Sequence, residues 1–144
     1  MTDAPARIVV GVDGSALSMN ALEYAIEEAQ LRKAELHITY AYPVMAMGVT
    51  GSTGRDYYDS VESEAKQFLQ GLMAKAPATD GVVVEWLAAP GNPSEVLIEA
   101  SKEATLLVVG SRGVGGFIGL LMGSVSTQCV HHSHCPVLVV REGH

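Results

Sequence analysis

The chain has 144 residues, a formal net charge of −7 and two cysteines. That length fits one domain, predicted over residues 1–144, and two cysteines are too few for a disulfide framework. The negative charge repels nucleic acid, and the apolar runs are too short to insert into a membrane, so we expect neither nucleic acid nor a membrane as a partner. Residues 1–5 lack a leader pattern, so we expect a cytoplasmic protein.

Strands and helices are predicted to alternate along the chain. Runs of β-branched and apolar residues predict strands over residues 7–12, 35–42, 82–87, 105–109 and 137–141. Apolar residues at helical spacing predict helices after the cap residue Ser15, over residues 57–76, from Pro93, and over residues 124–132. Residues 43–55 are rich in glycine and threonine and are predicted to form a loop. The alternation is typical of an α/β fold with a mainly parallel sheet covered on both faces.

A glycine-rich loop follows the fourth predicted strand. Gly110 is followed after two residues by Gly113, and after nine more by Gly123 and Ser124. Glycine lets a ligand approach the backbone, and the first amides of the next helix are unpaired donors at a positive dipole end, so the pattern predicts a phosphate cradle. It is not a Walker A loop, because no lysine follows Gly123, and Ile118 occupies the third glycine position of a dinucleotide fingerprint.

Two further segments accompany this loop, Val-Gly-Val-Asp-Gly-Ser at residues 10–15 and His-Cys-Pro-Val-Leu-Val-Val at residues 134–140. Together with the Gly-2x-Gly-9x-Gly-Ser spacing, they closely resemble the universal stress protein family, in particular its ATP-binding branch. The resemblance implies a single Rossmann-like domain with four helices and a five-stranded parallel sheet in the order 3-2-1-4-5. Ligands of such sheets bind where the strand order reverses, here between the first and fourth strands, which brings Asp13 beside the glycine loop.

The candidate phosphate ligands lie in the cradle. The glycines allow close backbone approach, and the helix start offers amides and hydroxyls; the residues are Gly110, Gly113, Gly123, Ser124, Val125 and Ser126. Arg112 lies inside the loop. It either supplies the cation that a Walker lysine would provide or is a solvated surface arginine.

Asp13 follows an apolar strand and carries an acceptor-only side chain. It either accepts hydrogen bonds from ribose hydroxyls or holds a water of a Mg²⁺ ion, or it caps its own turn. The resemblance favours the ligand role. It also implies that adenine lies at the ends of the first two strands, at Val12 and Ala41.

Cysteines and histidines crowd the segment from Cys129 to Cys135, a composition that suits zinc. These residues straddle a helix end ahead of Pro136 and lack paired ligand spacing, which favours capping and packing roles. The sequence has no motif that pairs a nucleophile with a base, and His37 in the second strand is expected to pack, so no catalytic residue is predicted.

We therefore predict that the chain binds ATP with Mg²⁺ and acts as a cytoplasmic, homodimeric sensor or regulator of the stress response. The resemblance implies the stress role and pairing through the last strand, from Val137 to Arg141, and an uncovered edge strand also favours pairing. Three alternatives are a weak ATPase or phosphotransferase, a cyclic-nucleotide-binding protein, and a nucleotide-free partner-binding module. The intact glycine pattern argues against the last.

Overall fold

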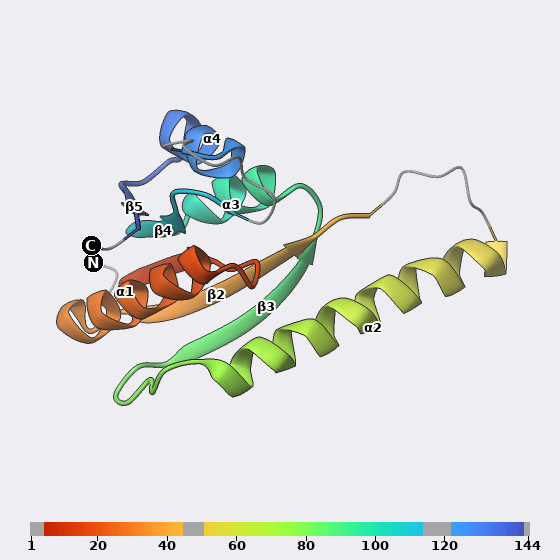
Figure 1. Ribbon diagram of the computed structural model, residues 1–144, viewed down its shortest axis with the longest axis horizontal. Helices are drawn as coiled ribbons and strands as arrows, with labels where there is room; N and C mark the ends of the chain where they lie inside the picture. Colours follow the sequence, from red (N-terminus) through yellow and green to blue (C-terminus); the bar gives the residue numbers. More distant parts are fainter. Residues whose placement is uncertain (1–4, 45–50, 114–121, 143–144) are drawn as a thin grey trace.

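The structure is a computed structural model and describes residues 5–44, 51–113 and 122–142. Its strands are β1 (Arg7–Gly11), β2 (Glu35–Tyr42), β3 (Val84–Pro90), β4 (Leu106–Gly110) and β5 (Val137–Val140). Its helices are α1 (Ala16–Arg32), α2 (Gly51–Lys75), α3 (Pro93–Ser101) and α4 (Ser124–His132). All strand pairs are parallel, and the sheet order is β3-β2-β1-β4-β5 (Figure 1). These elements confirm the predicted α/β class, strand order and four helices.

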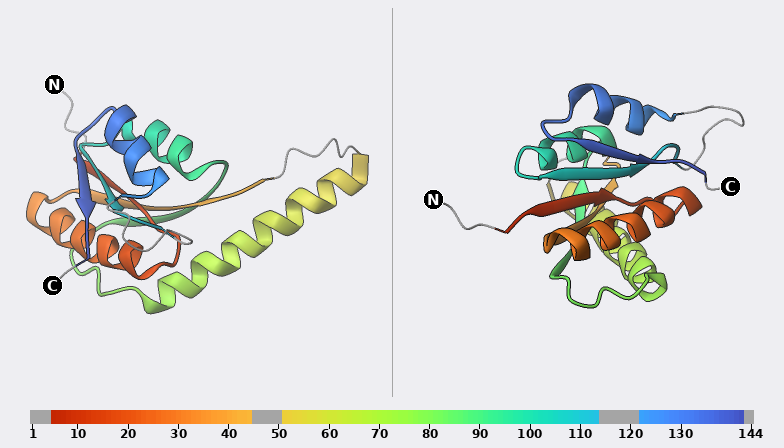
Figure 2. Two further views of the ribbon diagram at one scale, coloured as in Figure 1. Left: turned by 45° about the horizontal axis from the view of Figure 1, so that its top comes forward. Right: turned by 90° about the vertical axis from the view of Figure 1, so that its left-hand side faces the viewer.

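Helices cover both faces of the sheet (Figure 2). In β1, Ile8 and Val10 belong to the core formed with α1 and α2, whereas Val9 packs in a second core with Leu97 of α3 and Cys129 of α4. Successive side chains of a strand point to opposite faces, so one strand contributes to two cores. This double burial explains why the central strands are continuously apolar.

Helix α2 is longer than predicted. It begins at Gly51, so residues 51–55, which we predicted as loop, are helical. Glycine, serine and threonine are poor helix formers, but extending an existing helix adds one hydrogen bond per residue and overrides a weak preference. Of the apolar residues whose helical spacing predicted this helix, Ala65 and Leu69 are buried, whereas Phe68 is 41% exposed and packs on Tyr40 with ring centroids 4.7 Å apart.

Strand β3 lies further along the chain than predicted. It pairs with β2 from Leu36↔Val84 to Tyr42↔Pro90, so it continues beyond Leu87, where we expected it to end. Proline lacks an N–H donor but is tolerated in β3 because β3 is an edge strand of the described sheet. The ends of β1, β4 and β5 differ from the predicted ends by one residue, which leaves Arg141 outside the last strand.

The order of the strands reverses between β1 and β4. From β1 the chain moves outward to β2 and β3, and it then returns to β4 on the other side of β1, with β5 outside it. The carboxyl ends of these parallel strands share one edge of the sheet. The turn after β1 and the loop after β4 therefore meet there, as expected for a ligand site in such a fold.

Candidate functional site

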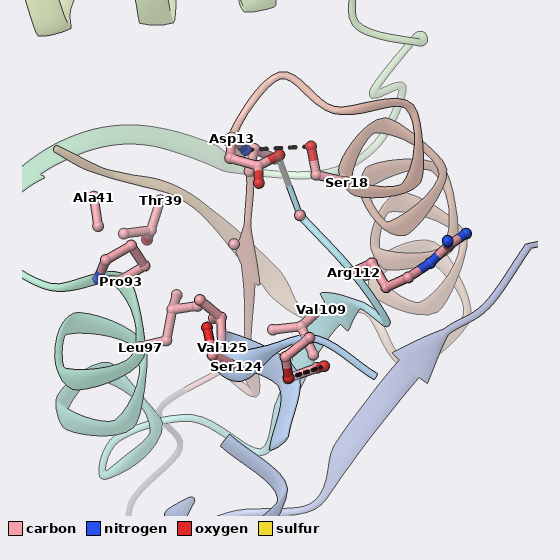
Figure 3. A pocket seen from close by; sticks show the side chains of 16 residues that line it. Asp13, Ser18, Thr39, Ala41, Pro93, Leu97, Val109, Arg112, Ser124 and Val125 are labelled. Carbon is pink, nitrogen blue, oxygen red and sulfur yellow. Dashed lines mark hydrogen bonds between the residues drawn. The ribbon is translucent and has the colours of Figure 1, made fainter. Parts of the chain in front are cut away.

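A cavity of about 460 Å³ opens at this edge of the sheet (Figure 3). It lies among the ends of β1, β2 and β4 and the first turns of α1, α3 and α4. The residues proposed from the sequence all line it: Val12, Asp13, Ala41, Gly110, Arg112, Gly113, Gly123, Ser124, Val125 and Ser126. The fold thus brings segments distant in sequence to one cavity whose size suits a small organic ligand.

Helix α4 presents its first turn to this cavity. Ser124, Val125 and Ser126 open the helix and line the cavity, and the N-cap position before them is Gly123. Glycine has no side chain to accept from the first amides, and no side-chain cap bond is made there among the described residues. The turn therefore directs amide donors and the positive end of the helix dipole at the cavity, an arrangement that suits an anion.

The Ser126 hydroxyl holds the loop after β4 through a buried hydrogen bond. Ser126 is 1% exposed, and its Oγ donates to the carbonyl of Ser111 over 2.6 Å. The amide of Gly123 donates to the same carbonyl, also over 2.6 Å. In this structure the hydroxyl proton that we assigned to a phosphate is therefore directed to the protein, whereas Ser124 is exposed at the helix start.

Two glycines of the loop make close contacts with other segments. A Cβ atom on Gly113 would lie 2.5 Å from Oδ2 of Asp13, and one on Gly110 would lie 3.1 Å from the backbone carbon and oxygen of Leu17 in α1. Gly113 thus lets the loop approach the Asp13 carboxylate. Gly110 lets α1 pack closely on the end of β4, a structural role in addition to any contact with a ligand.

Asp13 organises the turn between β1 and α1. Its Oδ1 accepts hydrogen bonds from the Ser15 amide at 2.9 Å and the Ser15 hydroxyl at 2.5 Å. Its own amide donates to Ser18 Oγ at 3.2 Å. The turn-capping role that we considered is therefore present, while the carboxylate also lines the cavity. Burial, and secondarily the Asp13 charge, raise the pKa of Tyr40.

Arg112 lines the cavity but directs its charge elsewhere. One guanidinium nitrogen donates to Glu142 Oε1, just beyond β5, in an ion pair. Figure 3 shows the side chain extending away from Ala41 and Thr39. The pair is at the surface, where such contacts contribute about 0–1 kcal/mol, so a ligand could compete for the arginine at little cost.

Sequence reasoning missed several residues of the cavity wall. They are Gly11, Ser18, Thr39, Pro93, Leu97 and Val109. Two simple signals point to most of them. Thr39 precedes Ala41 by two residues and so shares its face of β2, and the first turns of helices that follow parallel strands lie at the carboxyl edge.

The cysteine and histidine segment shows no metal arrangement. Within residues 5–44, 51–113 and 122–142, no group of three His, Cys, Asp or Glu residues could hold a metal ion. Cys129 is fully buried, and burial raises the pKa of its thiol to about 11. His37 makes polar contacts: its Nε2 lies 3.1 Å from Glu85 Oε2 and 3.4 Å from Glu35 Oε1, linking β2 to β3. None of the described helices has the length and apolar character needed to cross a membrane.

Comparisons with known proteins cover nearly the whole chain. The profile of the Universal stress protein family matches residues 6–141. Universal stress protein YxiE of Bacillus subtilis (strain 168) is 34% identical over 146 residues, which cover 94% of this chain and 98% of that protein.

Solved structures show the same fold. Universal stress protein UspA from Lactobacillus plantarum gives a TM-score of 0.74 at 23% identity, covering 97% of this chain and 100% of that one. A universal stress protein crystallised in complex with cAMP gives a TM-score of 0.71 at 29% identity, covering 96% and 98% of the two chains. Because the family profile spans nearly all of the described fold, the chain belongs to the Universal stress protein family.

Proposed function

We propose that the cavity binds an adenine nucleotide and that ATP is its principal ligand. The observation that carries this proposal is the first turn of α4, which has no side-chain cap among the described residues and faces a cavity of about 460 Å³. Apolar surface for a base is supplied by Ala41 of β2 and by Pro93 and Leu97 of α3. An anion-directed helix start and an apolar slot in one cavity suit the two ends of a nucleotide.

Magnesium suits the charges around the cavity. Its charged lining residues in the described part of the chain are Asp13 and Arg112, and Arg112 is paired with Glu142. A triphosphate beside Asp13 therefore needs a cation. Mg²⁺ prefers carboxylate and phosphate oxygens and retains several waters, so the phosphates would hold it, with Asp13 reaching it through a water.

Cyclic AMP is a second candidate ligand. A relative that is 29% identical was crystallised in complex with cAMP, and that complex supports the adenine nucleotide class as a whole. The pairing of Arg112 with Glu142 also favours a ligand with fewer charges, because a single phosphate can be bound by the amides of α4 without an added cation.

We further propose that two copies pair through β5 in the cytoplasm and that nucleotide occupancy regulates a stress-response partner. In the described sheet, β5 is an edge strand. The carbonyl of Pro136 accepts from the amide of Leu107 in β4, and that of Val140 accepts from the amide of Ser111 just after β4. The alternation of a strand therefore turns the backbone groups of Val137 and Val139 outward. A ligand at a hundredfold excess over its Kd stabilises the state that binds it by about 2.7 kcal/mol, enough to shift a regulatory equilibrium.

Pairing through β5 is tested by sedimentation of Val139→Pro. This change removes an outward N–H and leaves the ladder to β4, so we expect a folded monomer. Leu138→Pro removes an inward N–H and is expected to unfold the sheet edge. A dimeric Val139→Pro protein would contradict pairing through β5.

Nucleotide binding is tested by thermal shift and calorimetry with ATP, ADP, AMP, cAMP and GTP, each with and without Mg²⁺. We expect stabilisation by ATP that depends on Mg²⁺. Stabilisation by cAMP that is stronger than that by ATP and independent of Mg²⁺ would select the second candidate. If none of the nucleotides bound at millimolar concentration, the chain would be a partner-binding module instead.

A pair of glycine variants controls for stability. Gly113→Ala places a Cβ against Asp13 Oδ2 at 2.5 Å, so the loop or the carboxylate must move, and we expect affinity to fall by about tenfold or more. Gly71→Ala makes the same chemical change in α2, where nothing lies within 4 Å of the new atom. This control should bind normally and gain up to about 1 kcal/mol of stability.

A further inference from the structure

Thr39 is a buried polar residue in the wall of the cavity. It is 5% exposed and lies in the middle of β2, opposite Gly11 of β1 and Leu87 of β3. Its backbone carbonyl accepts from the amide of Val12 at 2.9 Å. Its hydroxyl makes no hydrogen bond with any residue that the structure describes. By contrast, the other buried hydroxyls of the wall, on Ser18 and Ser126, donate to main-chain carbonyls.

The Thr39 hydroxyl must reach open space. Among the described residues, every side-chain nitrogen or oxygen that is fully covered and not on an exposed residue has a hydrogen-bond partner. A hydroxyl without a partner on a residue as buried as Thr39 therefore retains access to a cavity. Thr39 borders the main cavity and a smaller one of about 270 Å³ beside it.

The neighbours of Thr39 define where in the main cavity it acts. Figure 3 shows Thr39 and Ala41 projecting from β2 toward Pro93 and Leu97 of α3. These neighbours are apolar, so a Thr39 hydroxyl turned into the main cavity would be the polar group of an otherwise apolar slot. The α4 amides that suit a phosphate belong to a different wall, which leaves the slot for the flat, apolar part of the ligand.

We propose that Thr39 is a specificity-determining residue that makes a hydrogen bond with the edge of the adenine base. The inference rests on the proposed function and adds to it a side chain that reads the base. A hydroxyl can donate to a ring nitrogen or accept from the exocyclic amine. A hydroxyl that opens onto an apolar slot has few hydrogen-bond partners in the free protein, so a ligand that completes its hydrogen bond gains affinity from it.

The test is Thr39→Val, which replaces the hydroxyl by a methyl group of similar size. Two opposite effects are expected from one change. The free protein should be as stable as wild type or more stable, because an unpartnered hydroxyl is removed. ATP affinity measured by calorimetry should fall by roughly five- to tenfold, the usual worth of one net hydrogen bond. Thr39→Ser retains the hydroxyl and should restore most of the affinity.

Thr105→Val is the matched control. The Thr105 hydroxyl lies at the opposite edge of the sheet and donates to the carbonyl of Arg7 at 2.9 Å. Removing it breaks an existing hydrogen bond, so this variant should lose stability and keep wild-type affinity. The two threonines thus predict opposite patterns in stability and in binding.

Base analogues identify the atom that is read. The probes are ATP analogues in which one ring nitrogen is replaced by carbon, and one that lacks the exocyclic amine. The analogue that lacks the partner atom should bind wild type more weakly than ATP does, and Thr39→Val should bind both equally.

The outcomes separate the two proposals. If wild type binds ATP and Thr39→Val binds it equally well, the role of Thr39 is overturned and nucleotide binding stands. The role of Thr39 is also overturned if Thr39→Val and Thr39→Ser lose the same affinity, relative to wild type, for ATP and for every analogue. If wild type binds no nucleotide, the proposed function fails, and the role of Thr39 fails with it.

Discussion

Helices α1 and α4 both begin at the cavity, and their first turns are built differently. The start of α1 is satisfied by its own side chains: Ser15 Oγ accepts from the Ser18 amide at 3.2 Å, and Asp13 accepts from Ser15. The start of α4 has Gly123 at the cap and, among the described residues, no side-chain acceptor. The first amides of any helix lack intrahelical acceptors, so both helix starts need acceptors from elsewhere. Helix α1 supplies them from its own turn, and helix α4 does not within the part of the chain that the structure describes.

The difference separates a structural turn at α1 from the turn at α4 that we propose as the binding turn. A carboxylate and hydroxyls at α1 hold the turn after β1 in place whether or not a ligand is present. At α4 the donors are left for something that is not part of the described chain, and glycine removes the side chain that would block its approach. If the proposed function holds, the cavity therefore has one fixed wall and one wall that a ligand would complete.

The largest expected effect concerns Cys129 in α4. Its thiol is fully buried, and burial raises its pKa to about 11, so alkylation near pH 8 requires α4 to open. If the ligand binds the closed first turn of α4, ATP at a hundredfold excess over Kd should slow labelling by about a hundredfold. Mass spectrometry would measure the rate, with the partly exposed Cys135 as the internal control. Equal rates with and without bound ATP would mean that α4 is not held by the ligand.

Gly123→Asp should convert the binding turn into a structural one. The glycine has φ −83° and ψ 178°, and an added Cβ would meet nothing closer than 3.4 Å, so aspartate fits. Its carboxylate would cap α4 and repel a phosphate, and we expect ATP affinity to fall by at least about tenfold while free stability is unchanged or slightly higher. Gly123→Asn caps without charge and should have a smaller effect. Unchanged affinity in Gly123→Asp would remove α4 from the site.

Ser15→Ala should weaken the fixed wall. It removes the hydroxyl that accepts from the Ser18 amide as the cap of α1 and that donates one hydrogen bond to Asp13, so the free energy of unfolding should fall by about 1–2 kcal/mol. The amide bond to Asp13 remains, so the turn is loosened rather than lost. Ser94→Ala is the matched change at α3, where Asn92 provides the cap, and it should lower the free energy of unfolding by a smaller amount. Urea denaturation would compare the free energies of unfolding of the two variants. An equal loss in both would show that the turn around Asp13 does not depend on the Ser15 hydroxyl.

Glu142→Gln should give the smallest change. It removes the negative partner of Arg112 and leaves the guanidinium available to an anion near Gly113. We expect ATP affinity to rise by about two- to threefold at low salt, with the gain falling as salt increases. Stability should change by less than about 1 kcal/mol because the pair is at the surface. A salt-independent affinity would show that Arg112 does not meet the ligand.

Residues that carry a local pattern were predictable from the sequence. The apolar runs predicted β1 and β4 to within one residue, and the glycine spacing with Asp13 predicted residues that do line one cavity. Their convergence followed from the strand order, because a parallel sheet places the carboxyl ends of its strands together.

What escaped prediction depends on distant partners. The direction of Arg112 is set by Glu142, thirty residues along the chain, and no local pattern records that pair. Strand β3 was misplaced because its extent follows from pairing with β2, while its β-branched start at Val82 and Val83 lies outside the strand. Thr39 was missed because a single threonine in a strand carries no motif.

The glycines of the loop differ in how much they reveal about function. A Cβ atom on Gly110 would lie 3.1 Å from the backbone of Leu17, so a relative that had lost every ligand would still need a glycine there for α1 to pack. Gly123 has an ordinary backbone conformation and room for a side chain, so packing does not demand it. In diagnosing which members of the family bind anions, a substitution at the position of Gly123 is therefore the informative one, and retention of Gly110 carries little weight.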